Sequence, residues 1–191
     1  MAPTPPARNL GWSAPDFELM ATDGRRYRRD ALRGPNGLLV MFICNHCPFV
    51  KAVLDKIVRD TRDLTTHGIG SVAVCSNDTV DYPEDSFEHM KALAQRMQFP
   101  FPYLWDETQN VAKAYGAVCT PDFFGFNAAL ELQYRGRLDD AGRAPKPDAP
   151  RELYAAMVEV ARSGSGPVTQ TPSIGCSIKW RREPPGVGPR A

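Results

Sequence analysis

Residues 38–51, LLVMFICNHCPFVK, decide the fold of this chain. The first six are apolar without a break, which predicts a strand that is buried on both faces. Residues 48–67 follow, and their apolar side chains recur at the spacing of one helix face, at Val50, Val53, Leu54, Ile57 and Leu64. The segment CNHC, residues 44–47, therefore lies at a strand-to-helix junction.

Cys44 and Cys47 have the C-x-x-C spacing, at which two thiols can close a small disulfide ring with little strain. The free N–H groups at a helix N-terminus and the positive end of the helix dipole favour a thiolate at such a junction. An imidazolium on His46, one residue before Cys47, would favour it further. The pattern indicates redox chemistry, and Cys44, Cys47 and His46 are the candidate catalytic residues.

The composition excludes several classes of function. The 191 residues fit one domain with a substantial core, and 23 basic against 22 acidic residues leave a net charge of +1. This balance gives no field that would attract nucleic acid or an acidic membrane surface. The first residues lack the apolar core of a signal peptide, and no stretch approaches the ~20 apolar residues of a membrane span. We therefore expect a cytoplasmic protein without nucleic-acid or membrane partners.

Five cysteines, at positions 44, 47, 75, 119 and 176, are too widely spaced for the disulfide framework of a small secreted domain. In a reducing compartment, the C-x-x-C pair is then catalytic or metal-binding. A zinc site would need a second pair of ligands, and the remaining cysteines are single. We expect no metal, and no cofactor beyond the cysteines themselves.

The rest of the first half predicts further strands and helices. Residues 1–15 carry four prolines and should form an extended or frayed lead-in. Residues 17–27 should form a β-hairpin around a tight Asp-Gly turn, at the edge of the main sheet. A second buried strand over residues 69–74 should be followed by a helix that Asp85 caps, with Glu88 three residues on.

The second half predicts a short strand, a short helix, an antiparallel pair and a closing helix, over residues 103–105, 109–115, 122–126, 130–134 and 150–162. Residues 165–191, rich in Gly, Pro and Ser, indicate a tail outside a domain that spans residues 16–164. By the right-handed crossover rule, strands of the first half are parallel neighbours, with helices on both faces. The expected fold is therefore an α/β sandwich with a mixed central sheet.

A C-x-x-C motif directly after the first strand of such an order resembles the thioredoxin superfamily. Further along, KAYG at 113–116 and TPDFF at 120–124 resemble the superfamily's loop in which a cis-proline faces the cysteines. The resemblance implies a thioredoxin fold and a cis Thr120–Pro121 bond, with both residues in the site. The hairpin and the inserted strand-helix segment are closest to the branch of thiol-specific antioxidants (AhpC/TSA) and TlpA-like disulfide reductases. The runs CNHCPFVK and PSIGCSIKW resemble a group of bacterial thioredoxin-like proteins.

Three positions depart from the pattern of the superfamily. Ile43 stands where thioredoxins have Trp, and Leu38 stands where they keep a buried carboxylate. The usual proton acceptor is therefore missing, and the sequence does not name its substitute. Classical peroxiredoxins carry Thr three residues before the peroxide-attacking Cys. Here Cys44 stands three residues before Cys47, which argues against peroxidase activity.

The leading hypothesis is a thiol-disulfide oxidoreductase that exchanges electrons between the Cys44/Cys47 pair and a protein or small-molecule disulfide or dithiol. The alternative is a thiol peroxidase, in which peroxide oxidises Cys47 to a sulfenic acid that Cys44 or Cys119 resolves. A non-enzymatic thioredoxin-fold binding module is the third hypothesis. The oligomeric state stays open.

The three other cysteines have different expected roles. Cys119 lies two residues before Pro121 and is a candidate third thiol beside the site. Cys176, in the tail, is either another thiol of the site or part of a docking segment. Cys75 lies at the end of an apolar strand, and we expect it to be a small residue of the core.

Spacing and context disagree on which cysteine attacks. In the C-x-x-C order, Cys44 is the first and usually exposed member. Pro48, however, suits the first helical position and leaves Cys47 as the N-cap, nearest to the free N–H groups of the first turn. We therefore predict that Cys47 is the nucleophile with the lower pKa and that Cys44 is its resolving partner.

Overall fold

The computed structural model describes residues 10–182. Its central strand β3 (Gly37–Phe42) and its helix α2 (Pro48–Thr65) confirm the two elements at the centre of the sequence interpretation. All six residues of β3 are buried. Because successive side chains of a strand point to opposite faces, β3 contributes to two cores. Leu39 and Met41 pack in one core, and Leu38, Val40 and Phe42 pack in the other.

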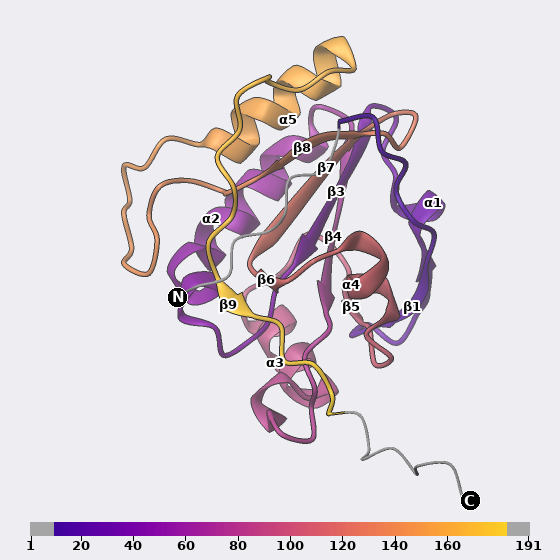
Figure 1. Cartoon of the computed structure of the whole chain (residues 1–191), viewed down its shortest axis with the longest axis vertical. Coiled ribbons are helices and arrows are strands. Elements are labelled where there is room, and N and C mark those ends of the chain that lie inside the picture. The colour runs from indigo at the N-terminus through magenta and orange to yellow at the C-terminus, as the bar shows by residue number, and fades with distance from the viewer. Residues whose placement is uncertain (1–9, 183–191) are drawn as a thin grey trace, which may run out of the picture.

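Two groups of hydrogen-bonded strands lie side by side (Figure 1). The first has the order β2 (Arg26–Arg28), β1 (Glu18–Ala21), β5 (Tyr103–Trp105) and β4 (Ile69–Cys75), and the second has the order β3, β7 (Asp122–Asn127) and β8 (Leu132–Gly136). β3 runs beside β4, where the Ile43 N–H donates to the Val74 carbonyl at 3.1 Å. β4 and β5 are parallel, whereas the other pairs in these groups are antiparallel. The mixed sheet and its edge hairpin are therefore confirmed.

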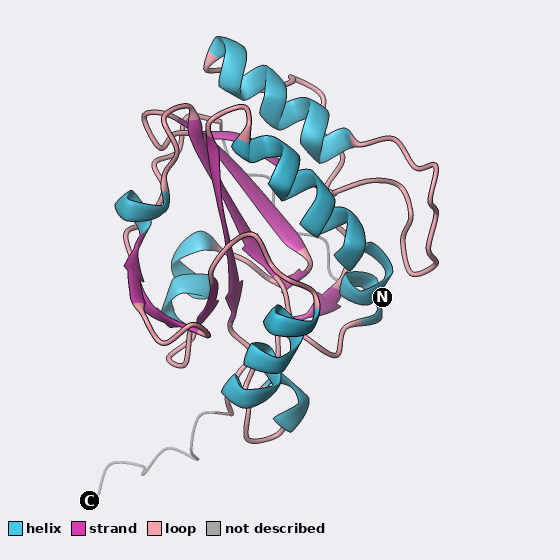
Figure 2. Ribbon diagram, turned by 180° about the vertical axis from the view of Figure 1, so that it is seen from behind, coloured by secondary structure: helices cyan, strands magenta, loops and turns pink. Residues whose placement is uncertain are grey.

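Helices cover both faces of this layer, as predicted (Figure 2). α2, α3 (Phe87–Arg96) and α5 (Glu152–Ser163) pack in the core that contains Leu39 and Met41. On the opposite face, α4 (Asn110–Tyr115) and the short α1 (Arg29–Leu32) contribute to the second core. Within residues 10–182, no helix has the length and apolar character needed to cross a membrane.

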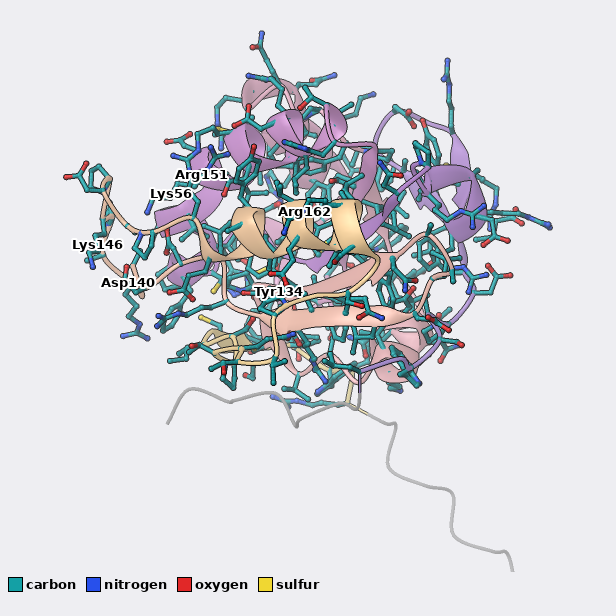
Figure 3. The ribbon with its side chains drawn as sticks, turned by 90° about the horizontal axis from the view of Figure 1, so that it is seen from above. Lys56, Tyr134, Asp140, Lys146, Arg151 and Arg162 are labelled. Carbon is teal, nitrogen blue, oxygen red and sulfur yellow. The ribbon has the colours of Figure 1, made fainter. Side chains whose placement is uncertain are left out.

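Ion pairs fix the start of α5 on α2 (Figure 3). Arg151 contacts Asp60 at 2.7 Å and Asp63 at 2.6 Å. Lys56, also on α2, contacts Asp139 in the loop before α5. Asp60 is completely buried, so its carboxylate depends on charged partners of this kind.

The first described residues, 10–15, lie against the domain. They belong to the segment 1–15 whose four prolines predicted an extended or frayed lead-in. The Ala14 N–H donates to the Leu130 carbonyl at 2.9 Å, and Ala14 itself is buried. Residues 10–15 are thus held on the turn between β7 and β8. The remainder of the predicted lead-in, residues 1–9, lies outside the described residues.

The tail also follows the domain. The Thr171 carbonyl accepts a hydrogen bond from the Arg137 N–H at 2.9 Å, and the Ser173 hydroxyl donates to the Gly136 carbonyl at 2.7 Å. Beyond these contacts with the end of β8, the short strand β9 (Cys176–Ser177) pairs with β6 (Cys119–Thr120). Figure 1 shows the tail returning from α5 across the molecule to β6.

The prediction that Asp85 caps the helix after β4 is wrong. That helix, α3, begins at Phe87, and the residue that flanks it is Ser86, without a side-chain cap. Asp85 belongs to the preceding 3-10 turn η1 (Pro83–Asp85), and its side chain is completely buried. The carboxylate turns away from the helix because it is hydrogen-bonded to the loop that carries the cysteines.

Candidate active site

The cysteine loop lies between the end of β3 and the start of α2. Cys47 flanks the helix with φ −63° and ψ 124°, and Pro48 is the first helical residue, as the sequence predicted. Cys44 is 1% exposed and Cys47 is 0% exposed, and both are free thiols. Other parts of the chain therefore cover both sulfur atoms.

The loop at Pro121 lies against these cysteines. The Thr120–Pro121 peptide bond is cis, as the resemblance implied. Cys44 Sγ lies 3.3 Å from the Thr120 hydroxyl oxygen, and the Cys47 thiol donates to the Thr120 carbonyl at 3.1 Å. One residue thus contacts both sulfur atoms, and the structure brings the predicted cysteines and the predicted loop together.

Hydrogen bonds separate the pKa values of the two cysteines. A hydrogen bond from the Cys44 thiol lowers the pKa of Cys47 to about 4, against the effect of burial, and Cys176 and the Val50 N–H lower it further. The same thiol–thiol bond, together with burial and the charge of Asp85, raises the pKa of Cys44 well above its usual value. Val50 is the third residue of α2, so the first turn of the helix contributes to the lowered pKa, although the Cys47 side chain makes no cap hydrogen bond. In its thiolate form, Cys47 accepts hydrogen bonds instead of donating one.

A buried carboxylate holds the loop in place. Asp85 accepts a hydrogen bond from the Asn45 N–H at 2.7 Å, and its other oxygen accepts from the Asn77 side-chain amide at 2.7 Å. That second oxygen also lies 2.7 Å from Nδ1 of His46. Tyr82 stacks on the His46 ring, with the centroids 5.6 Å apart. Asp85 and Tyr82 together fix the orientation of the imidazole.

Asp85 is a candidate site residue that the sequence interpretation missed. A ring nitrogen of His46, a carboxylate oxygen of Asp85 and the sulfur of Cys44 all lie within 4.8 Å of one another. The pair therefore places a titratable group beside Cys44, although Leu38 stands where thioredoxins have their carboxylate. An Asp-x-x-Glu spacing before an apolar helix is also the signal of an N-terminal cap, so the pattern pointed to the wrong role.

The AhpC/TSA family model matches residues 10–138, which is more than half of the chain. The chain belongs to the AhpC/TSA family. The matched range includes the cysteine loop, Asp85 and the cis Thr120–Pro121 bond, whereas Cys176 lies beyond it. Membership of the AhpC/TSA family supports a redox role for the site.

Solved structures show how far the similarity extends. An uncharacterized conserved protein from Geobacillus kaustophilus is 44% identical, with a TM-score of 0.89, and the match covers 96% of this chain and 98% of that one. A hypothetical protein from Sinorhizobium meliloti 1021 is 38% identical, with a TM-score of 0.90, and the match covers 94% and 99%. Both matches extend over nearly the whole of this AhpC/TSA protein.

The fold is shared more widely than the sequence. The thioredoxin domain of a thiol-disulfide oxidoreductase from Bacteroides vulgatus is 13% identical, with a TM-score of 0.61, and the match covers 81% of this chain and 99% of that one. A search of curated proteins found no match. The predicted thioredoxin fold of this AhpC/TSA protein is thereby confirmed.

Cys44, His46 and Asp85 also form a group that could hold a metal ion. They offer three ligand atoms, where a structural zinc site uses four. Both oxygens of Asp85 already accept hydrogen bonds, one from Asn45 and the other from Asn77. The arrangement in this AhpC/TSA protein therefore fits a hydrogen-bonded acid–base pair better than a metal centre.

The other three cysteines have different surroundings. Cys119 is completely buried, burial raises its pKa, and its sulfur lies 3.7 Å from the Pro121 carbonyl oxygen. Cys75 is buried at the end of β4, where burial raises its pKa to about 12, as suits a core residue. Cys176 is half-buried and lies opposite Thr120 in the β6–β9 pair, and burial together with Cys47 raises its pKa to about 11. The geometry therefore favours Cys176 as a third thiol, where the sequence favoured Cys119.

Proposed function

We propose that this protein is a thiol-disulfide oxidoreductase in which Cys47 attacks and Cys44 resolves. The observation that carries the proposal is the position of Cys47 at the N-terminus of α2, against the Thr120 carbonyl, where Cys44 and the Val50 N–H lower its pKa to about 4. The thiolate is the attacking form of cysteine, and these contacts favour it at neutral pH. The raised pKa of Cys44 keeps that residue protonated until the second step.

The reaction consists of two exchange steps. In the first, the Cys47 thiolate attacks a disulfide R–S–S–R′, so that a bond forms between Cys47 and one substrate sulfur while R′–S⁻ leaves. In the second, the sulfur of Cys44 attacks that of Cys47, which forms the Cys44–Cys47 disulfide and releases R–S⁻. The substrate gains two electrons and the cysteine pair loses two. A dithiol partner returns the pair to its reduced form by the reverse steps.

The second step needs a base, because Cys44 must lose its proton before it attacks. The His46–Asp85 pair lies within 4.8 Å of the Cys44 sulfur. In the proposed step, His46 takes up the proton, and the buried carboxylate stabilises the imidazolium that forms. His46 and Asp85 thus substitute for the carboxylate that the chain lacks at Leu38.

A hollow beside Pro121 fits the group that flanks the substrate disulfide. Its apolar lining includes Phe49, Val53, Phe123, Leu138 and Ile174. Arg137 and Asp139 at the same hollow offer polar contacts. We propose a protein or small-molecule disulfide or dithiol as the partner. The proposal includes a cytoplasmic location. It also gives no part to nucleic acid or membrane, because the charge is balanced.

Exchange with glutathione disulfide tests the assignment. Wild-type protein should form a Cys44–Cys47 disulfide, which mass spectrometry finds within the single tryptic peptide 34–51. Cys47→Ser should abolish exchange. Cys75→Ser, which replaces another buried thiol, should leave exchange intact. Exchange at the wild-type rate in the Cys47→Ser protein would show that Cys47 is not the nucleophile.

A thiol peroxidase is the second candidate, because the side chain of Cys47 is 0% exposed. Hydrogen peroxide is small enough for a buried sulfur, whereas a protein disulfide needs the covering chain to move. The Cys47 thiolate would take one oxygen atom and release hydroxide, after which Cys44 would form the disulfide and water would leave. Stopped-flow oxidation by hydrogen peroxide and by glutathione disulfide separates the candidates, since the faster oxidant identifies the reaction. A non-enzymatic binding module would react with neither.

A further inference from the structure

The tail strand β9 lies on the edge of β6, directly beside the cysteines. In this antiparallel pair, Cys176 lies opposite Thr120. Thr120 is also the residue that contacts the sulfur atoms of both Cys44 and Cys47. The register of two short strands therefore brings a third sulfur to the site.

Cys176 acts on the proposed nucleophile. Its thiol and its backbone N–H both lower the pKa of Cys47. It also packs against the core cluster that contains Cys44 and Cys47. Both of those residues are buried, whereas Cys176 is half-buried. Of the three cysteines, Cys176 is therefore the most accessible to a partner in solution.

The backbone of the tail is fitted to this position. Gly175 passes so close to Thr120 that a Cβ atom at position 175 would clash with the Thr120 carbonyl group. After β9, the Lys179 N–H donates to the Asn77 side chain at 2.9 Å. The close approach on one side of Cys176 and the hydrogen bond on the other hold this residue in register.

We propose that Cys176 is a third redox-active thiol, which resolves the mixed disulfide at Cys47 from the solvent side, while Cys44 resolves it from the core side. This inference rests on the oxidoreductase function proposed above and adds a second resolving residue to it. Cys176 lies outside the range that the family model matches, because that range ends at residue 138.

The added step is an ordinary thiol–disulfide exchange. The sulfur of Cys176 loses its proton and attacks Cys47, so that the Cys47–Cys176 bond forms and R–S⁻ leaves and takes up a proton. Cys44 then attacks Cys47 in turn, forms the Cys44–Cys47 disulfide and returns Cys176 to its thiol form. The same two electrons pass to the substrate by either route.

This route gives a buried redox pair a means of exchange with partners. A disulfide between Cys44 and Cys47 lies between two residues that are at most 1% exposed. A disulfide between Cys47 and Cys176 has one half-buried sulfur, which a dithiol in solution can attack. Exchange between the two disulfides would therefore make a buried disulfide accessible to a dithiol in solution.

Tryptic mapping distinguishes the two disulfides, because the cysteines fall in separate peptides. Cys44 and Cys47 lie in peptide 34–51, and Cys176 lies in peptide 163–179. Cys44→Ser protein is oxidised with glutathione disulfide and then blocked with N-ethylmaleimide. We expect the two peptides to be linked through Cys47 and Cys176. The double variant Cys44→Ser/Cys176→Ser should instead keep glutathione on Cys47.

Gly175→Val tests the position of the tail without the loss of a thiol. In the Cys44→Ser background, the new side chain should displace Cys176 and abolish the link between the peptides. Ser177→Ala, at an exposed position of β9, is the matched control and should retain the link. Circular dichroism and thermal unfolding establish that each variant is folded.

The outcomes separate this inference from the proposed function. If Cys44→Ser protein retains glutathione on Cys47 as long as the double variant does, Cys176 is not a resolving thiol, and the oxidoreductase proposal stands. A link that persists in Gly175→Val would overturn the role given to the docked tail. If the double variant takes up no glutathione at Cys47, both proposals fail.

Discussion

The Nδ1 atom of His46 lies 2.7 Å from the Oδ2 atom of Asp85, and this contact joins the cysteine loop to a turn 39 residues further along the chain. The Asn45 N–H holds the other carboxylate oxygen at 2.7 Å. The pair lies within 4.8 Å of the Cys44 sulfur. Because Asp85 is completely buried and both of its oxygens accept hydrogen bonds, the pair is suited to take up the proton of the resolving thiol.

Asp85→Asn separates two effects of this carboxylate. The charge of Asp85 raises the pKa of Cys44, so its removal alone would speed the attack by Cys44. If the His46–Asp85 pair accepts the proton, the same change slows that attack. We expect it to slow by about 100-fold, at the lower end of what general base catalysis contributes. Stopped-flow measurement of the second step decides, with Tyr82→Phe as the control. A faster second step would contradict the proton-acceptor role.

His46→Leu tests whether the imidazole acts on the thiols. We expect the second exchange step, in which Cys44 attacks Cys47, to slow, because the variant lacks the base that takes up the Cys44 proton. Stopped-flow measurement of that step tests this, and the pH dependence of Cys47 alkylation is the control. A second step at the wild-type rate would show that His46 is a bystander.

The lowered pKa of Cys47 gives a distinct pH profile. Between pH 8 and pH 6, alkylation of Cys47 should change by less than about twofold, whereas a free cysteine with a pKa of about 8.5 slows by about 80-fold. The same peptide in urea-unfolded protein provides the control. Because the folded-state pKa lies below the unfolded one, the thiolate stabilises the reduced fold fully above about pH 8.5, and this stability is lost as the pH falls toward about 4. An alkylation rate in the folded protein that follows the unfolded control would contradict the assignment.

Arg151→Ala should destabilise the fold without an effect on exchange. The change removes the 2.7 Å contact with the completely buried Asp60, which leaves Arg59 as a partner of that carboxylate. Since Arg151 is itself partly exposed, we expect a loss of about 1–2 kcal/mol in the free energy of unfolding, measured in urea. Arg162→Ala, further along α5, is the control and should stay within about 0.5 kcal/mol (Figure 3). Equal losses in both variants would show that the buried pair has no special role.

The local part of the site could be predicted because its signals are short-range. An unbroken apolar strand, a C-x-x-C pair and a proline at the first helical position lie within a few residues of one another, and the structure has them as expected. The loop around Pro121 was predictable from a second motif. These signals need no knowledge of how distant segments meet.

The rest of the site depends on contacts between distant segments. Asp85 has the spacing of a helix cap, and only the packing of its turn against the cysteine loop gives it another role. Cys176 lies in a segment whose Gly, Pro and Ser content predicts a loose tail, and β9 is two residues long. A two-residue strand is too short to produce a period-2 pattern, so no sequence signal could have paired it with β6.

The position of Cys176 has a consequence for how the protein matures in the cell. Cys176 follows Cys47 by 129 residues. A ribosome that adds about 5–20 residues per second needs roughly 6–26 s for this distance. Until then, nothing from the tail covers the nucleophile or pairs with the edge of β6, which leaves the nascent chain open to wrong disulfides and to strand pairing with other chains. The chemistry of the site is thus complete only once Cys176 has been added to the chain.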